Sequence, residues 1–198
     1  MNETWIELTH QIHEMGSKTG NCLSLLQKAF IYTSRESLED CLRKLAAIKA
    51  QEPVLSKKIA EMVRQEKERK VYAEIPKHFL EICGHLEVLA EMLRKKIDEN
   101  ILFSDRAVTE ISFLSQNLLE ILNAATDLVL VKNPILVRYV EESEAMVEKA
   151  TIQYATHHEE RLIEGLCLPM SSSVFLKVLE SLKGIAREAK CISERMAI

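Results

Sequence analysis

Two pairs of glutamates are the residues of this chain whose type and spacing could do chemistry. Glu87 and Glu91 lie four residues apart in one predicted helix, and Glu144 and Glu148 repeat that spacing in a later one. On a helix this spacing places both carboxylates on one face, where they repel each other by roughly 0.2–0.5 kcal/mol unless a cation joins them. Carboxylate oxygens are the ligands that hard metal ions prefer. The pattern leaves two interpretations open: a metal ion bridging carboxylates from two helices, or solvated glutamates relieved by cations such as Lys95.

Other signatures of catalysis are absent from the sequence. It contains no GxGxxG, GxxxxGK[ST], GxSxG or HExxH motif. A di-iron carboxylate bundle needs a Glu-x-x-His pair on each of two helices, and the chain has only Glu7 with His10. Its five cysteines lack the spacing of a zinc site. Cys22 and Cys83 fall on or beside apolar helix faces and are interpreted as small buried apolar residues, which agrees with a reducing compartment. We therefore expect a non-enzymatic, cytoplasmic protein.

The composition favours an all-α protein and excludes several partners. Of 198 residues, 47% are hydrophobic and only 5 are glycine and 4 proline, which is typical of packed helices. The net charge of -4 comes from acidic and basic residues mixed along the chain, so no nucleic-acid partner is expected. The chain starts without a secretory signal and has no apolar run of about 20 residues. Any contact with a membrane should therefore go through a partner.

Apolar residues spaced alternately three and four apart predict the helices. The expected helices cover roughly residues 3–32, 33–70, 76–97, 105–128, 134–164 and 171–196. The expected capping and stop residues are Thr33 with Glu36, Ser104 or Asp105, Asn133 before Pro134, Gly165, and one of Ser171, Ser172 and Ser173. Gly16 and Gly20 lie inside the first helix, where they predict a close approach of a neighbouring helix.

The helical pattern is written twice. Sliding the chain by 96 residues places Phe79 on Phe175, and both halves follow the order helix, longer helix, helix. The fold expected from this repeat is six helices arranged as two tandem antiparallel three-helix bundles, 1–99 and 100–198, packed side by side as one rigid body. The connection 100–105 has no flexible character, which agrees with that packing.

The outer faces of the two copies differ in charge. The positions of Glu87 and Glu91 correspond to Lys183 and Arg187 in the second copy. Two cations at these positions oppose the binding of a divalent ion. The repeat therefore predicts a core that is duplicated in the two copies and, at the surface, no full metal site in the second copy.

The segments "HLEVLAEMLRKKI" and "SLKGIAREAKCIS" resemble the third helix of each unit in the PhoU family. These proteins are regulators of bacterial phosphate uptake built as two three-helix bundles, and the resemblance covers essentially the whole chain. It implies that metal-binding carboxylates fall on Glu87 and Glu91 in the first unit, and on Glu144 and Glu148 in the second helix of the second unit. A divalent or ferric ion would be the ligand, and no other cofactor is expected.

The closing stretch "ERLIEGLCLPMSSSVFLKVLESLKGI" is similar to the PhoU-like region at the C-terminus of bacterial sodium/phosphate cotransporters, which also has a lysine at the position of Lys183. The transmembrane part is missing, so the chain is expected to be a free-standing relative or a piece of a longer protein. The resemblance implies a regulatory adaptor that docks to a phosphate transporter or a phosphate-signalling protein. The alternative is a metal-binding helical bundle with a surface carboxylate site. The oligomeric state stays open, with a homodimer among the options.

Overall fold

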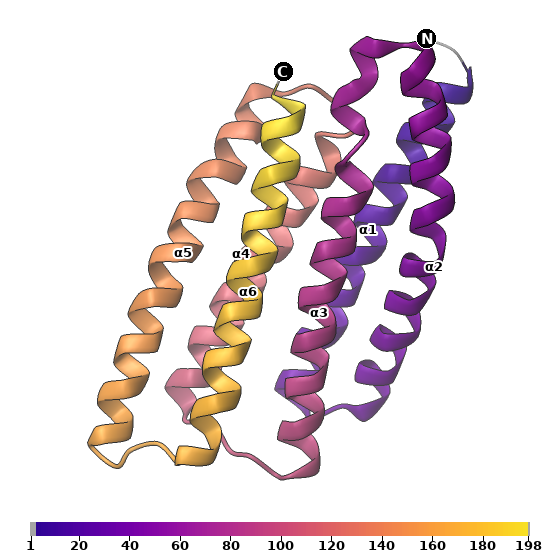
Figure 1. Ribbon diagram of the computed structural model, residues 1–198. Helices are drawn as coiled ribbons and strands as arrows, with labels where there is room; N and C mark the ends of the chain where they lie inside the picture. Colours follow the sequence, from indigo (N-terminus) through magenta and orange to yellow (C-terminus); the bar gives the residue numbers. More distant parts are fainter. Residues whose placement is uncertain (1–2, 198) are drawn as a thin grey trace.

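The computed structural model describes residues 3–197, which form six α-helices and one short 3-10 segment (Figure 1). The elements are α1 (Glu3–Tyr32), α2 (Arg35–Gln65), the 3-10 segment η1 (Lys67–Tyr72), α3 (Ile75–Asp98), α4 (Asp105–Asp127), α5 (Pro134–Ile163) and α6 (Pro169–Met196). The prediction of an all-α, six-helix fold is confirmed.

The helices alternate in direction and form two groups of three, α1–α3 and α4–α6, which lie side by side (Figure 1). The two groups join because α3 packs along α6 and α1 packs along α4. The α1–α2, α3–α4 and α5–α6 turns lie at the end of the molecule opposite the chain termini, and we call it the turn end. The division between residues 99 and 100 falls in the α3–α4 connection. The division into two units, 1–99 and 100–198, stays a prediction.

The core repeats in the two halves as the spacing predicts. Phe79 on α3 and Phe175 on α6 are both completely buried, and so are Leu86 and Leu182 one heptad further along each helix. Equivalent apolar stripes on α3 and α6 therefore fill equivalent positions. Because these two helices also pack on each other, the halves share one continuous core.

Gly16 confirms a close approach of helices. A Cβ atom at this position would lie 2.5 Å from Oγ1 of Thr126 on α4 and 2.6 Å from Cζ of Phe79 on α3. At Gly20 the nearest atom, on Asn123, would be 3.6 Å away, which is an ordinary contact. The three helices that meet at Gly16 thus need a residue without a side chain there.

Three of the predicted boundary residues are confirmed. The Ser104 hydroxyl accepts a hydrogen bond from the backbone N–H of Ala107 at the start of α4. The Asn133 side chain accepts one from Ile135 at the start of α5. Gly165 follows the end of α5 with a φ of 72°, a left-handed conformation that suits glycine.

Two predicted helix starts were wrong. The cap of α2 is Ser34, whose hydroxyl accepts from the backbone N–H of Ser37, because Thr33 takes the left-handed conformation (φ 54°) that reverses the chain after α1. The sixth helix begins at Pro169 and has no serine cap. Proline is favoured in a first helical turn because its φ is already helical and its missing N–H would have no partner there.

The predicted extension of the second helix to residue 70 was also wrong. The α-helix ends at Gln65, and Lys67–Tyr72 forms the 3-10 segment η1. Arg69 of this segment pairs with Glu66, and its guanidinium lies 4.6 Å from the ring centre of Trp5 on α1. This part of the charged run therefore packs on the first helix.

Within residues 3–197, no helix combines the length and apolar content that crossing a membrane requires.

Candidate functional site

The first predicted carboxylate pair lies on the outer face of α3. Both oxygens of Glu87 accept hydrogen bonds from Nζ of Lys49 on α2, each at 2.9 Å. This hydrogen bond and the Glu87 charge raise the pKa of Lys49. Glu91, one turn further along α3, is exposed. Glu87 therefore has a cationic partner that is part of the fold.

The second predicted pair is divided between the interior and the surface. Glu144 on α5 is buried, and its carboxylate accepts a hydrogen bond at 2.9 Å from Nζ of Lys190 on α6. The hydrogen bond and the charge of Glu144 raise the pKa of Lys190. Glu148 is exposed. Glu144 therefore ties α5 to α6.

The structure does not bring the four glutamates together. Glu87 and Glu91 lie on α3 and Glu144 and Glu148 on α5, and these helices make no contact in the described part of the chain because α6 lies between them (Figure 1). Each pair would need its own metal ion, and that ion would have to displace Lys49 or Lys190. The carboxylate site stays a prediction.

The second copy carries its cations where the repeat placed them. Lys183 on α6 is half-buried and Arg187 is exposed. The partners that sequence reasoning missed are Lys49 and Lys190. Glu144 offered a signal, since it falls between the apolar stripe positions Val140 and Val147 of α5, where a carboxylate needs a partner inside the protein.

A buried ion pair joins α4 to α5 near the turn end. Glu110 accepts hydrogen bonds from both terminal nitrogens of Arg161, at 3.1 and 2.9 Å, and a third from Nε of Arg106 at 3.2 Å. The side chains of Glu110 and Arg161 are only 6% and 11% exposed. Such a pair fixes the register of two helices, and breaking it leaves a buried charge without a partner.

His158 lies beside this pair in the core of the second half. Its ring stacks on Phe175 with 4.5 Å between ring centres, and Nε2 lies 2.6 Å from the Ser172 hydroxyl. Burial and the charge of Arg161 lower the pKa of His158. The imidazole is therefore neutral near pH 7, and its surroundings give it a structural role.

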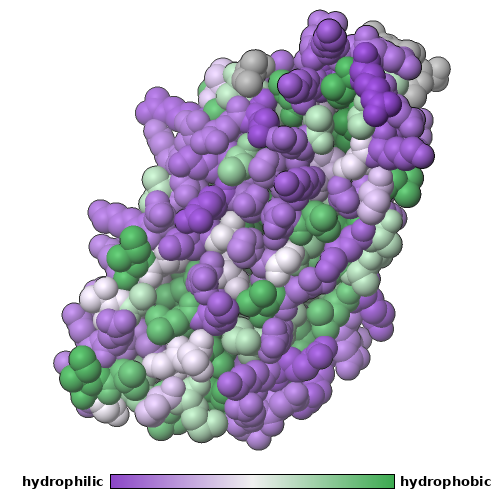
Figure 2. Space-filling model, in the orientation of Figure 1, coloured by the Kyte–Doolittle hydropathy of each residue, from purple (hydrophilic) through white to green (hydrophobic). Residues whose placement is uncertain are grey.

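The turn end carries a concentration of exposed apolar side chains. The large apolar residues exposed in its three turns are Ile31 and Tyr32, Leu102, and Ile163, Leu166, Leu168 and Met170. The last four, which we call the apolar turn, join α5 to α6, and Ile163 alone is 87% exposed. Figure 2 shows hydrophobic surface at this end of the second half. Contiguous exposed apolar side chains of this kind mark interaction sites.

Acidic side chains border the apolar turn on its α5 side, and the largely exposed Arg106 of α4, which contacts His157, is a cation at the same end. Glu159, Glu160 and Glu164 are exposed along its α5 side. The nearest cation in the sequence, Arg161, is half-buried and its charge is used by Glu110. An acidic rim repels anionic lipid and attracts a basic surface. The surface at this end therefore combines exposed apolar side chains with an acidic rim.

The fold of this chain is PhoU-like, with two three-helix groups side by side. A structure from Shewanella oneidensis MR-1, described as a PhoU-like phosphate regulatory protein, superposes with a TM-score of 0.65 and 16% identity over 96% of this chain and 97% of that one. A second structure from the same organism, a PhoU-like protein, gives a TM-score of 0.60 and 15% identity over the same shares. No protein-family model and no curated protein matches the sequence. The structural likeness confirms the PhoU-like fold that the sequence predicted.

Proposed function

We propose that this chain is a non-enzymatic regulatory protein of phosphate transport, acting in the cytoplasm by docking to a membrane phosphate transporter or to its signalling partner. The likeness to a PhoU-like phosphate regulatory protein over 96% of this chain and 97% of that one carries the proposal. Because the likeness covers nearly the whole of both chains, it includes the packing of the two halves and is not limited to a single helical hairpin. The absence of known catalytic motifs from the sequence agrees with a protein that acts by binding.

The apolar turn is the surface we assign to docking. Fully burying a side chain such as Ile163 or Leu166 against a partner contributes roughly 1.5–3 kcal/mol. Both lie in the same turn with Leu168 and Met170, so one partner groove can cover them together. Clustered apolar anchors at the centre of an interface supply most of its binding energy.

The acidic rim of Glu159, Glu160 and Glu164 favours a membrane transporter as the occupant. Cytoplasmic loops of membrane proteins carry an excess of Lys and Arg. Such a loop offers positive charge to the rim, and apolar residues near it can cover the turn. The same rim disfavours direct binding to an anionic membrane surface.

Co-purification from membranes tests the proposal. The wild-type chain should co-purify with a phosphate transporter or a phosphate-signalling protein, and a strain lacking the chain should show altered phosphate uptake. Ile163→Asp should weaken the association at least about tenfold, because it removes an apolar anchor and would bury an unpaired carboxylate at the apolar centre of the interface.

The matched control is Ile135→Asp. Ile135 is 75% exposed at the start of α5, at the opposite end of the molecule from the apolar turn. This variant should retain the partner. No associated transporter or signalling protein, together with unchanged phosphate uptake in the deletion strain, would overturn the proposal.

A further inference from the structure

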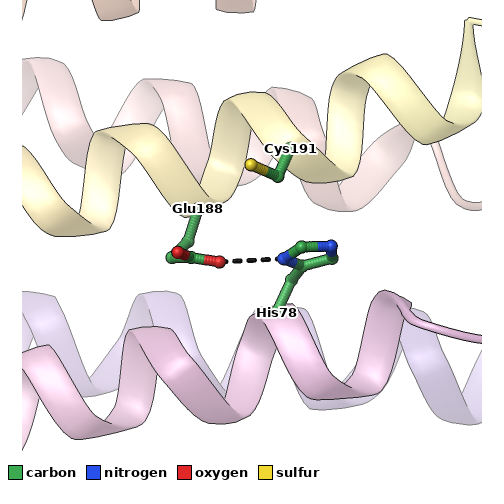
Figure 3. A group of neighbouring side chains, drawn as sticks. All are labelled: His78, Glu188 and Cys191. Carbon is green, nitrogen blue, oxygen red and sulfur yellow. Dashed lines mark hydrogen bonds and ion pairs between the residues drawn. The ribbon is translucent and has the colours of Figure 1, made fainter.

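Three side chains with different metal-binding chemistry meet between the two halves of the molecule. His78 lies on α3 of the first half, and Glu188 and Cys191 lie one turn apart on α6 of the second half (Figure 3). One ligand atom from each residue lies within 4.8 Å of the other two. Among residues 3–197, no other three His, Cys, Asp or Glu side chains come as close together.

The distances are near those of a metal site. Nδ1 of His78 lies 2.8 Å from Oε2 of Glu188, and Figure 3 shows the Cys191 sulfur beside this contact. Tetrahedral zinc binds nitrogen, oxygen and sulfur at about 2.0–2.3 Å, which places its ligand atoms roughly 3.3–3.8 Å apart. Side-chain rotations that move the ligand atoms by about 1 Å would therefore allow these three atoms, which lie within 4.8 Å of one another, to bind one ion.

The helices hold these side chains at a fixed spacing. Phe79, next to His78, is completely buried, and so are Ala189 and Ile192, which neighbour Glu188 and Cys191 on α6. The backbone that presents the ligands is therefore anchored by the shared core of the two halves. A site built on packed helices keeps its geometry better than one built on loops.

The cluster is also accessible and incompletely bonded. The side chains of His78 and Glu188 are 17% and 20% exposed, and Cys191 is only partly buried, so an ion can enter from solvent. Nε2 of His78 is buried and has no hydrogen-bond partner among residues 3–197. Nδ1 therefore makes the hydrogen bond to Glu188, and an ion bound at Nδ1 would replace that bond and leave the imidazole proton on Nε2.

We propose that His78, Glu188 and Cys191 bind one zinc-class divalent ion that cross-links the two halves. The donor set selects the metal, because thiolate and imidazole favour Zn²⁺ over Mg²⁺ or Ca²⁺, which prefer oxygen alone. Water completes the coordination as the fourth ligand. The site is separate from Glu87, Glu91, Glu144 and Glu148, and it does not depend on the proposed role in phosphate transport.

Cobalt substitution tests this site directly. Purified protein in a phosphine reductant should bind one equivalent of Co²⁺, with a near-ultraviolet absorption band from charge transfer between the Cys191 thiolate and cobalt. Zinc should displace the cobalt and abolish the band. Zinc should also raise the unfolding temperature, since the ion binds the folded state and joins its two halves.

Two variants separate metal binding from folding. Cys191→Ser should lose the charge-transfer band. Glu188→Gln keeps an acceptor for Nδ1–H of His78, so its unfolding temperature without metal should stay near that of the wild type. Its Co²⁺ affinity should fall at least about tenfold, because even the loss of a group that only contacts a metal ligand lowers metal affinity about ten- to a hundredfold. Cys167→Ser, at the other partly buried cysteine, is the control and should bind as the wild type does.

Two kinds of cobalt-binding result would contradict the proposal. A wild-type protein without the charge-transfer band would overturn it. A band that persists in Cys191→Ser, or one lost in Cys167→Ser, would assign the cobalt to a different cysteine and overturn it as well. These results leave phosphate regulation untouched, because the readout involves no transporter.

Discussion

The buried ion pair between Glu110 and Arg161 gives the sharpest stability prediction. Arg161→Met removes both hydrogen bonds from Arg161 to Glu110, whose side chain is 6% exposed. Among residues 3–197, Glu110 then keeps the largely exposed Arg106 as its one cationic partner. Removing one member of a buried pair costs about 3–5 kcal/mol, and here the remaining carboxylate would lose most of its compensation. In a chain of this size that corresponds to a fall of roughly 6–20 °C in the unfolding temperature.

Thermal and urea unfolding followed by circular dichroism at pH 7 measures this effect. The double variant Glu110→Leu with Arg161→Met removes both charges, so it should be less destabilised than Arg161→Met alone. Arg138→Met is the control, because Arg138 pairs with Glu142 on the surface and should have no measurable effect. If Arg161→Met unfolds at the temperature of Arg138→Met, the pair does not hold α4 to α5 as we describe.

Three further predictions follow from the core and the surface. Because the pKa of His158 is lowered by folding, the unfolded chain takes up a proton more readily than the folded one. The free energy of unfolding should therefore fall as the pH drops below about 6.5, by at most about 1.4 kcal/mol per pH unit. Urea unfolding at several pH values measures this, and His158→Gln should reduce the slope. Gly16→Ala should lower the unfolding free energy by about 1–3 kcal/mol through overpacking, while Gly20→Ala should be neutral or stabilising, and equal effects in urea unfolding would refute the close approach. If the surface carboxylates hold an ion, replacing Glu87 and Glu91 with alanine should lower the metal content measured by elemental analysis, and an unchanged content would end that hypothesis.

The helices and most of their ends could be predicted from the sequence because they depend on local spacing. The apolar stripe around Phe175 and the caps at Ser104 and Asn133 involve residues within a few positions of each other. The cap at Ser34 was missed because the reversal of the chain after α1 decides which residue takes the left-handed conformation. The start of α6 was predicted wrongly because the helix begins at Pro169 without a polar capping side chain.

The contacts between helices could not be predicted in the same way. His78 and Glu188 are 110 positions apart, and the rotation of α3 against α6 decides whether they meet. Glu110 and Arg161 are separated by 51 positions and depend equally on packing. Cysteine spacing gave no indication of the proposed zinc site, because His78 comes from the first half of the chain and Glu188 and Cys191 from the second.

The apolar turn did leave a signal in the sequence. Leu166 and Leu168 lie between Gly165 and Pro169, the residues that predict the break between the last two helices. Large apolar residues in a predicted turn have no helical face to bury them. Their exposure in the folded chain can therefore be predicted from the sequence. The acidic rim could not, because it depends on where the glutamate side chains lie in the structure.

Photo-crosslinking in cells tests the docking proposal most directly. A photoreactive residue at Ile163, the most exposed side chain of the apolar turn, should crosslink to a membrane phosphate transporter or a phosphate-signalling protein identified by mass spectrometry, while the same residue at Ile135 should not. Absence of such a crosslink at Ile163, with phosphate uptake unchanged when the chain is deleted, would contradict it.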